Sequence, residues 1–265
     1  MNHLLLKSRA LLSAFVAMLL LSASPAMAQI TDLNAAINKA GRERMLSQRM
    51  AKAYFQLGQD IDVERSQRVL DSSIALFDRQ LVELKNFAPE AHTRQTSQQL
   101  EQAWIAYKDA LVGRLPSQEH ALEVLKRSDE VLALAHRLTA QFEALAGTPV
   151  GHLVNIAGRQ RMLSQRMAKL VQAINWKLAD DTMAAELAKA RKEFIAADLE
   201  LNEAAVNNDR IKRDLQLVSQ QWFFFQDALD QKALEARKRA HNIATTSERI
   251  LEMMEEVVAG YEALR

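Results

Sequence analysis

The residues best suited to bind an anion lie in a motif that the sequence carries twice. Residues 38–52 read NKAGRERMLSQRMAK, and residues 155–169 read NIAGRQRMLSQRMAK, so 13 of 15 positions are identical at an offset of 117 residues. Helix packing alone would preserve the apolar pattern and let the polar residues drift, yet the arginines, the Ser-Gln pair and the glycine recur. A recent duplication is the alternative, but the flanking segments have diverged. We therefore interpret the motif as chemically constrained.

The central candidates are Arg44 and, in the second copy, Arg161. On a helical wheel at 100° per residue, each falls in a stripe of small and apolar residues. A buried guanidinium is costly unless a carboxylate from another helix, or a bound anion, pairs with it. Both pairings stay open from spacing alone. Neutral donors one turn away could add hydrogen bonds to an oxyanion, and they are Ser47, Gln48, Ser164 and Gln165.

Two further features of the motif predict contacts. Glycine within a helix costs about 1 kcal/mol relative to alanine, so Gly41 and Gly158 indicate that another backbone approaches closely at this level. Arg42, Arg49 and Lys52 fall on a different side of the helix, which we expect to be a solvated or partner-facing basic face.

Long helices must position these residues. Strong helix formers dominate the chain, while glycine (7) and proline (4) are rare. The few breaks predict eight helices, at residues 31–58, 61–87, 90–113, 118–146, 149–179, 182–206, 209–230 and 233–264. Short loops between long amphipathic helices favour antiparallel neighbours. We therefore predict an all-α fold of two tandem up-down four-helix bundles, residues 29–147 and 148–265.

Aromatic residues extend the repeat into the third helix of each bundle. Trp104 corresponds to Trp222 at an offset of 118, and we expect both in the core. Phe223, Phe224 and Phe225 cannot all face one core, because consecutive helical residues lie 100° apart. At least one should face a neighbouring domain or subunit.

The N-terminus predicts export. Residues 1–28 contain Lys7 and Arg9, an apolar run over residues 10–21, and the cleavage pattern Ala26-Met27-Ala28, which is the plan of a secretory signal peptide. An uncleaved anchor is the alternative. Cleavage would leave 32 Lys+Arg and 33 Asp+Glu, a near-neutral balance that argues against a general nucleic-acid binder. We expect a soluble periplasmic protein that folds without disulfides, since the chain has no cysteine.

Catalytic and cofactor signatures are missing from the sequence. The six histidines never stand three or four residues apart, and no Glu-x-x-His occurs, so the di-iron bundle pattern is absent. There is no zinc-protease helix and no Gly-rich phosphate loop. We expect no enzyme, metal or cofactor.

The pattern Asn-x-Ala-Gly-x-x-Arg-Met-x-Ser-x-Arg, complete in both copies, resembles the P-box of the periplasmic sensor domains of nitrate/nitrite histidine kinases (NarX-like). It resembles still more closely the N-terminal domain of PilJ-type chemotaxis transducers of type IV pili. The resemblance implies that the arginine before the methionine, Arg44 or Arg161, binds nitrate or nitrite where two first helices meet. Lys39 matches the P-box lysine, whereas the second copy has Ile156.

Two functions follow as hypotheses. The first is a sensor-like periplasmic protein that binds a small anion and signals through a membrane sensor or a pilus-related partner. The second is a structural or adaptor bundle of the envelope or of type IV pili that binds no ligand. A carboxylate paired to Arg44 would favour the second.

The arrangement of the two motif helices is also open. They could meet within one molecule and share one anion between Arg44 and Arg161, because a two-fold interface needs the same surface on both sides. The alternative is a rod in which each motif helix pairs with a second chain of a homodimer.

Overall fold

The structure is a computed structural model that describes residues 30–178, 182–231 and 235–264. The signal peptide predicted at residues 1–28 lies outside the described residues. The described chain is all-α and contains no strand, which confirms the predicted fold class. Its eight helices are α2 (Leu33–Gly58), α3 (Val63–Phe87), α4 (Ala91–Val112), α5 (Gln118–Ala146), α6 (Pro149–Asn175), α7 (Met183–Glu203), α8 (Asp209–Asp230) and α9 (Ala236–Glu262).

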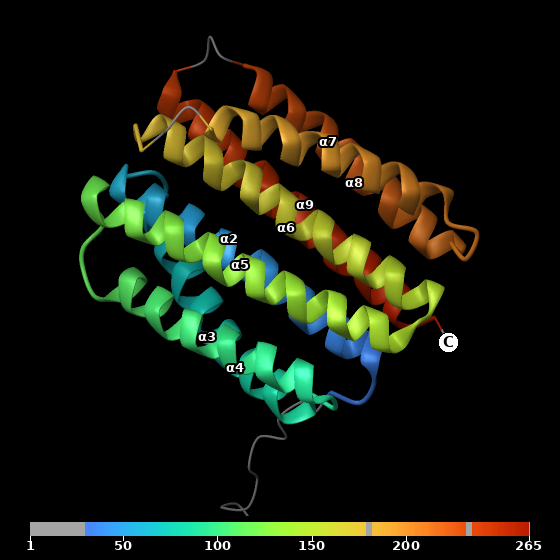
Figure 1. Ribbon diagram of the computed structural model, residues 1–265. Helices are drawn as coiled ribbons and strands as arrows, with labels where there is room; N and C mark the ends of the chain where they lie inside the picture. The colour runs from blue at the N-terminus through green and yellow to red at the C-terminus, as the bar shows by residue number, and fades with distance from the viewer. Residues whose placement is uncertain (1–29, 179–181, 232–234, 265) are drawn as a thin grey trace, which may run out of the picture.

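Local capping explains why the helices begin where the sequence predicts. The side chain of Asp32 caps α2, and the hydroxyl of Ser117 accepts a hydrogen bond from the backbone of α5. Between α5 and α6, Gly147 takes a left-handed conformation (φ 57°) and Thr148 caps the next helix. The chain reverses at this point, so α5 and α6 form a hairpin and the rod is wrong (Figure 1).

The two halves lie side by side and meet through their motif helices. In the first half α2 packs against α3 and α5, and α4 packs against α5. In the second half α6 packs against α7 and α9, and α8 packs against α9. Helices α2 and α6 pack against each other, which confirms the intramolecular pairing of the two motif helices. Across the molecule the order is α3 and α4, α2 and α5, α6 and α9, then α7 and α8 (Figure 1).

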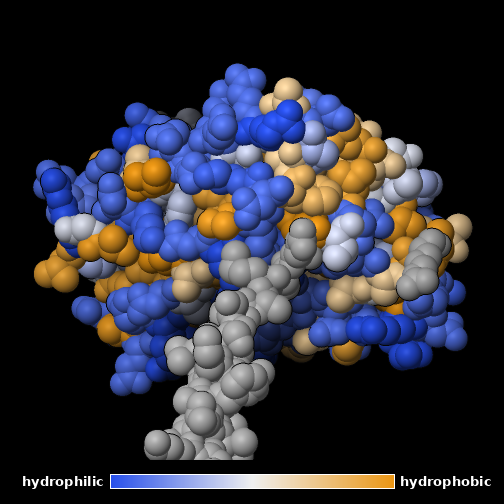
Figure 2. Space-filling model, turned by 90° about the horizontal axis from the view of Figure 1, so that it is seen from below, coloured by the Kyte–Doolittle hydropathy of each residue, from blue (hydrophilic) through white to orange (hydrophobic). Residues whose placement is uncertain are grey.

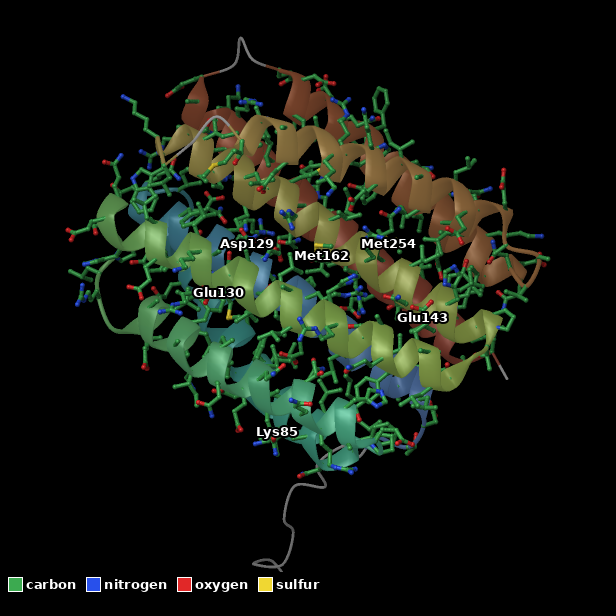
Figure 3. All side chains as sticks on the ribbon, viewed as in Figure 1. Lys85, Asp129, Glu130, Glu143, Met162 and Met254 are labelled. Carbon is green, nitrogen blue, oxygen red and sulfur yellow. The ribbon has the colours of Figure 1, made fainter. Side chains whose placement is uncertain are left out.

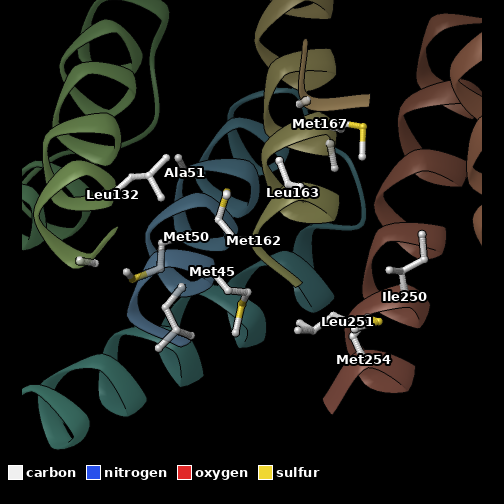
Figure 4. Close-up of a cluster of buried hydrophobic side chains, with 14 of the residues drawn as sticks. Met45, Met50, Ala51, Leu132, Met162, Leu163, Met167, Ile250, Leu251 and Met254 are labelled. Carbon is white, nitrogen blue, oxygen red and sulfur yellow. The ribbon is translucent and has the colours of Figure 1, made fainter. Parts of the chain in front are cut away.

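One hydrophobic core runs through both halves. Its central part contains Met45 and Met50 from α2, Met162 and Met167 from α6, and Met254 from α9 (Figure 4). Flexible methionines fill irregular gaps well, and here they fill the space where three helices from both halves converge. The outer face seen in Figure 2 carries mostly hydrophilic residues with apolar ones between them.

The core placement of the two tryptophans is confirmed, while a contact of the phenylalanine triplet with a neighbouring domain or subunit stays a prediction. Trp104 stacks on Phe77 and Trp222 stacks on Phe194, each with ring centroids 4.1 Å apart. Phe225 is fully buried. Exposure is 68% for Phe223 and 53% for Phe224, so the triplet does divide between the core and the outer face. Within the described ranges, no helix is both long and apolar enough to cross a membrane.

Candidate functional site

The two motif arginines come together where α2 and α6 cross. Arg44 and Arg161 are both fully buried. A Cβ built on Gly158 would stand 3.2 Å from Nη2 of Arg161, 3.4 Å from Nη2 of Arg44 and 4.0 Å from the Cα of Gly41. The glycines therefore let the two backbones and the two guanidinium groups share one small volume, as the sequence predicts.

Arg161 is neutralised by a carboxylate of its own half. Its Nη1 donates to Oε2 of Glu255 at 2.7 Å, and its Nη2 donates to Oδ1 of Asn38 at 2.8 Å. Arg42 binds the same carboxylate through Nη2, at 2.6 Å. Burial alone would raise the pKa of Glu255, but Arg161 and Arg42 outweigh it and hold that pKa at about 2. Glu255 therefore stays ionised.

Arg44 has no such partner. Among the described residues, no carboxylate oxygen lies within 4.0 Å of its guanidinium. Its Nη2 donates to the backbone oxygen of Asn155 at 3.1 Å, its Nη1 lies 3.4 Å from Nδ1 of His136, and its Nε makes no hydrogen bond. Burial, followed by the charges of Arg161 and Arg159, lowers the pKa of Arg44 to about 9. Glu143 acts in the opposite direction but does not outweigh them. This buried charge therefore has no direct carboxylate partner among the described residues, which favours anion binding over an internal ion pair.

His136 and Glu255 occupy equivalent positions in the two halves. Their offset of 119 residues is that of the segments 142–145 and 261–264, and each faces the motif arginine of its own half. Burial lowers the pKa of His136, and the charges of Arg44 and Arg159 lower it further. His136 is therefore neutral near pH 7, and the two halves differ by one negative charge at this position.

The serines of the motif bond within their own helices and the glutamines bond to neighbouring helices, so neither pair supplies side-chain donors to a shared site. The hydroxyl of Ser47 donates to the Arg44 carbonyl, and that of Ser164 donates to the Arg161 carbonyl, both at 2.8 Å. Gln48 donates to the Ser128 backbone in α5 at 3.1 Å, and Gln165 donates to the Ser247 backbone in α9 at 3.0 Å. Lys39 forms an ion pair with Glu83 of α3 at 2.5 Å. Of the predicted site residues, the structure thus gathers only Arg44, Arg161, Gly41 and Gly158.

The expected solvated basic face is wrong. Lys52 is buried, and both Lys52 and Arg49 pair with Glu248 of α9 at 2.5 Å. In the second copy, Lys169 is fully buried and pairs with Asp129 of α5 at 2.8 Å. Each lysine thus reaches a carboxylate in the opposite half. A wheel drawn for one helix could not reveal a partner from the other half.

A pocket of about 470 Å³ opens beside the arginine pair, between α5, α6 and α7. Asp129 of α5 and Met162 of α6, both labelled in Figure 3, line it. His136 also lines it and contacts Arg44, so it separates the pocket from that buried charge. The lining residues are Asp129, Leu132, Ala133, His136, Arg159, Met162, Leu163, Arg166, Glu186, Lys189, Ala190 and Glu193.

Sequence reasoning missed the residues that face the motif from α5 and α9, the last helix of each half. His136, Glu255, Asp129 and Glu248 stand outside the repeated stretch, and the residue differs between the copies at both positions that they occupy. The signal was available in the offset of 119 residues, which aligns His136 with Glu255 and Asp129 with Glu248.

Comparison with known proteins yields one family. The family described as Type IV pili methyl-accepting chemotaxis transducer N-term (PilJ) matches residues 26–147 and again residues 148–248. No curated protein and no solved structure matches the chain. Because the two matches together span most of its length, the chain belongs to this family of chemotaxis transducer N-terminal domains and carries the domain twice.

Proposed function

We propose that this protein is a periplasmic sensor that binds one small monovalent oxyanion beside Arg44 and signals its presence through a partner protein. The observation that carries the proposal is the fully buried Arg44 with no carboxylate within 4.0 Å among the described residues. A buried, unpaired cation is costly, and a bound anion removes that cost. Membership of a transducer family supports the sensory role, and the sequence of residues 1–28 supports export.

Binding would act on the contact between α2 and α6. The guanidinium groups of Arg44 and Arg161 repel each other across this contact, and an anion beside Arg44 weakens that repulsion. The ligand therefore favours the arrangement in which the two helices are closely packed over any arrangement in which they are apart. A partner that contacts both halves could read this shift.

Thermal unfolding and calorimetry with nitrate, nitrite, chloride and sulfate test the proposal. We expect one anion per chain and, at 100 times Kd, about 2.7 kcal/mol of added stability. Arg44→Ala should abolish binding. Arg191→Ala is the matched control, since Arg191 pairs with Asp230 outside the site and its loss should leave the affinity unchanged. If none of these anions stabilises the protein, a small inorganic anion is ruled out as the ligand.

The second candidate is a structural or adaptor bundle of the envelope or of type IV pili. It is favoured by Arg161, whose charge is met internally by Glu255, and by the motif lysines that bind the two halves together. On this hypothesis Arg44→Ala would change only stability, and no anion would shift the unfolding temperature.

A further inference from the structure

The pocket between α5, α6 and α7 has an equivalent between α9, α2 and α3, which ion pairs close. Arg42 and Arg49 of α2 correspond to Arg159 and Arg166 of α6. In the closed equivalent, Arg42 pairs with Glu255 and Arg49 pairs with Glu248. On the open side Arg159 and Arg166 line the pocket and pair with Glu193 and Glu186 of α7, which line it too.

In the closed equivalent, Glu255 is a carboxylate of the protein itself that binds two arginines. It accepts hydrogen bonds from Arg161 at 2.7 Å and from two nitrogens of Arg42 at 2.6 and 3.2 Å. The equivalent arginines on the open side are Arg44 and Arg159, and the residue between them is His136, which carries no carboxylate. On the open side, Arg159 pairs with Glu193 of α7 instead, and Arg44 has no directly paired carboxylate among the described residues.

Nε2 of His136 is the ring nitrogen that can donate a hydrogen bond. A guanidinium can only donate, so the contact between Nη1 of Arg44 and Nδ1 of His136 at 3.4 Å requires Nδ1 to accept. The proton of the neutral ring is then on Nε2. The charge of Arg44 polarises the ring of His136, and that ring forms part of the pocket wall.

The charges in and behind the pocket favour an anion. The lining includes three cationic side chains (Arg159, Arg166 and Lys189) and three carboxylates (Asp129, Glu186 and Glu193), which cancel formally. Behind the lining lie Arg44, which contacts His136, and Lys169, which pairs with Asp129. Glu143 offsets part of the Arg44 charge, so the site keeps a positive surplus.

The rest of the lining is apolar and favours an organic ligand. Leu132, Ala133, Met162, Leu163 and Ala190 line the same pocket. A volume of about 470 Å³ lies in the range of small-molecule sites and far exceeds what a three-oxygen inorganic anion would fill.

We propose that this pocket binds an organic monocarboxylate, with the carboxylate between Nε2–H of His136 and the guanidinium of Arg159 and an apolar chain against Leu132, Met162 and Leu163. On the open side, the ligand's carboxylate takes the place that Glu255 has on the closed side, as the negative group beside two arginines. This proposal rests on the proposed function, because both need the unpaired charge of Arg44. It goes further in naming the class of ligand.

Calorimetry with hexanoate tests it, with 1-hexanol as the uncharged probe of equal chain length. We expect one hexanoate per chain and no binding of hexanol. His136→Glu places an internal carboxylate beside Arg44, as Glu255 stands beside Arg161, so this variant should unfold at a higher temperature and lose hexanoate binding. Unaltered hexanoate affinity in His136→Glu would overturn the proposal.

Arg159→Gln provides a second variant, since Arg159 is 41% exposed through its side chain and its loss leaves the core intact. It should weaken hexanoate at least tenfold, while the matched control Arg191→Gln, on α7 outside the pocket, changes it less than twofold. No binding of hexanoate, or equal binding of hexanol, overturns the ligand class. Nitrate binding that is lost in Arg44→Ala would in that case leave the proposed function standing, whereas failure of nitrate and hexanoate together removes both.

Discussion

Two arginines with the same neighbours in sequence meet opposite electrostatic conditions. Arg161 is met by Glu255, while Arg44 is met by His136 and a backbone oxygen. In a buried ion pair, the attraction between the two charges offsets part of the cost of removing them from water. A lone buried charge has no such offset. The difference gives each arginine a separate expected effect on stability.

In the absence of ligand, Arg44→Met should raise the free energy of unfolding by roughly 1–3 kcal/mol, because it removes an unpaired buried charge. Arg161→Met should lower it by roughly 2 kcal/mol, because it removes hydrogen bonds to a charged partner. Urea unfolding followed by circular dichroism measures both. Equal destabilisation by the two substitutions would show that Arg44 has an internal partner.

His136 should make stability depend on pH. Its folded pKa lies below the usual value of about 6.5 because of burial, then Arg44 and Arg159, which outweigh Glu143 and Glu193. Below pH 6.5 the unfolded chain therefore binds a proton that the folded chain does not, and stability falls as the pH drops toward the folded pKa. We expect a smaller loss between pH 7.5 and 5.5 in His136→Gln, measured by urea unfolding. A loss equal to that of the unaltered protein would contradict this assignment.

The helix α2 illustrates how much the sequence predicts and where it stops. Its start follows from the local cap at Asp32, its glycine from the close approach of α6, and Arg44 from its place in the apolar stripe. These are short-range signals within one helix. The partners of Lys52 and Arg42 come from α9, about 200 residues away, and no periodicity within α2 could identify them.

The crossing of α2 and α6 depends on its glycines. A Cβ at Gly158 would stand 3.2 and 3.4 Å from the two guanidinium groups, which are the flexible ends of their side chains. Gly158→Ala should therefore change the free energy of unfolding by less than about 1 kcal/mol, since alanine also favours the helix by a similar amount. The displaced guanidinium groups should weaken anion binding about tenfold, as calorimetry would show.

Gly151→Ala is the matched control for that substitution. It lies in the same helix and is equally crowded, with three atoms 3.2 Å from its Cβ position, but none belongs to the site. Anion affinity should stay within twofold. A similar loss of affinity in both variants would mean that helix strain, rather than the position of the guanidinium groups, controls binding.

At the scale of the whole molecule, a buried lysine of each half pairs with a carboxylate of the other half. Lys52 of the first half pairs with Glu248 of the second, and Lys169 of the second pairs with Asp129 of the first. Separate folding of residues 29–147 and 148–265 stays a prediction from the repeat. Any half that folds alone would leave its buried lysine without this partner.

We therefore expect the two halves, produced as separate chains cut at Gly147–Pro149, to be helical and to associate one to one. Light scattering of the mixture after size-exclusion chromatography measures the complex. Replacing Lys52 and Lys169 with alanine in the respective halves should weaken the association by at least tenfold. Halves that remain monomeric when mixed would show that the α2–α6 contact needs the covalent link.

The presence of Glu255 in one half only has a consequence for the dose–response of this protein. In a homodimer every substitution appears on both sides of the two-fold axis, so two identical sites would compete for, or cooperate over, the ligand. In a single chain the two sides can differ, and here Glu255 pairs with Arg161 while His136 faces Arg44. The titration curve should therefore be a simple hyperbola with a Hill coefficient of one, and the protein would report concentration in proportion rather than as a threshold.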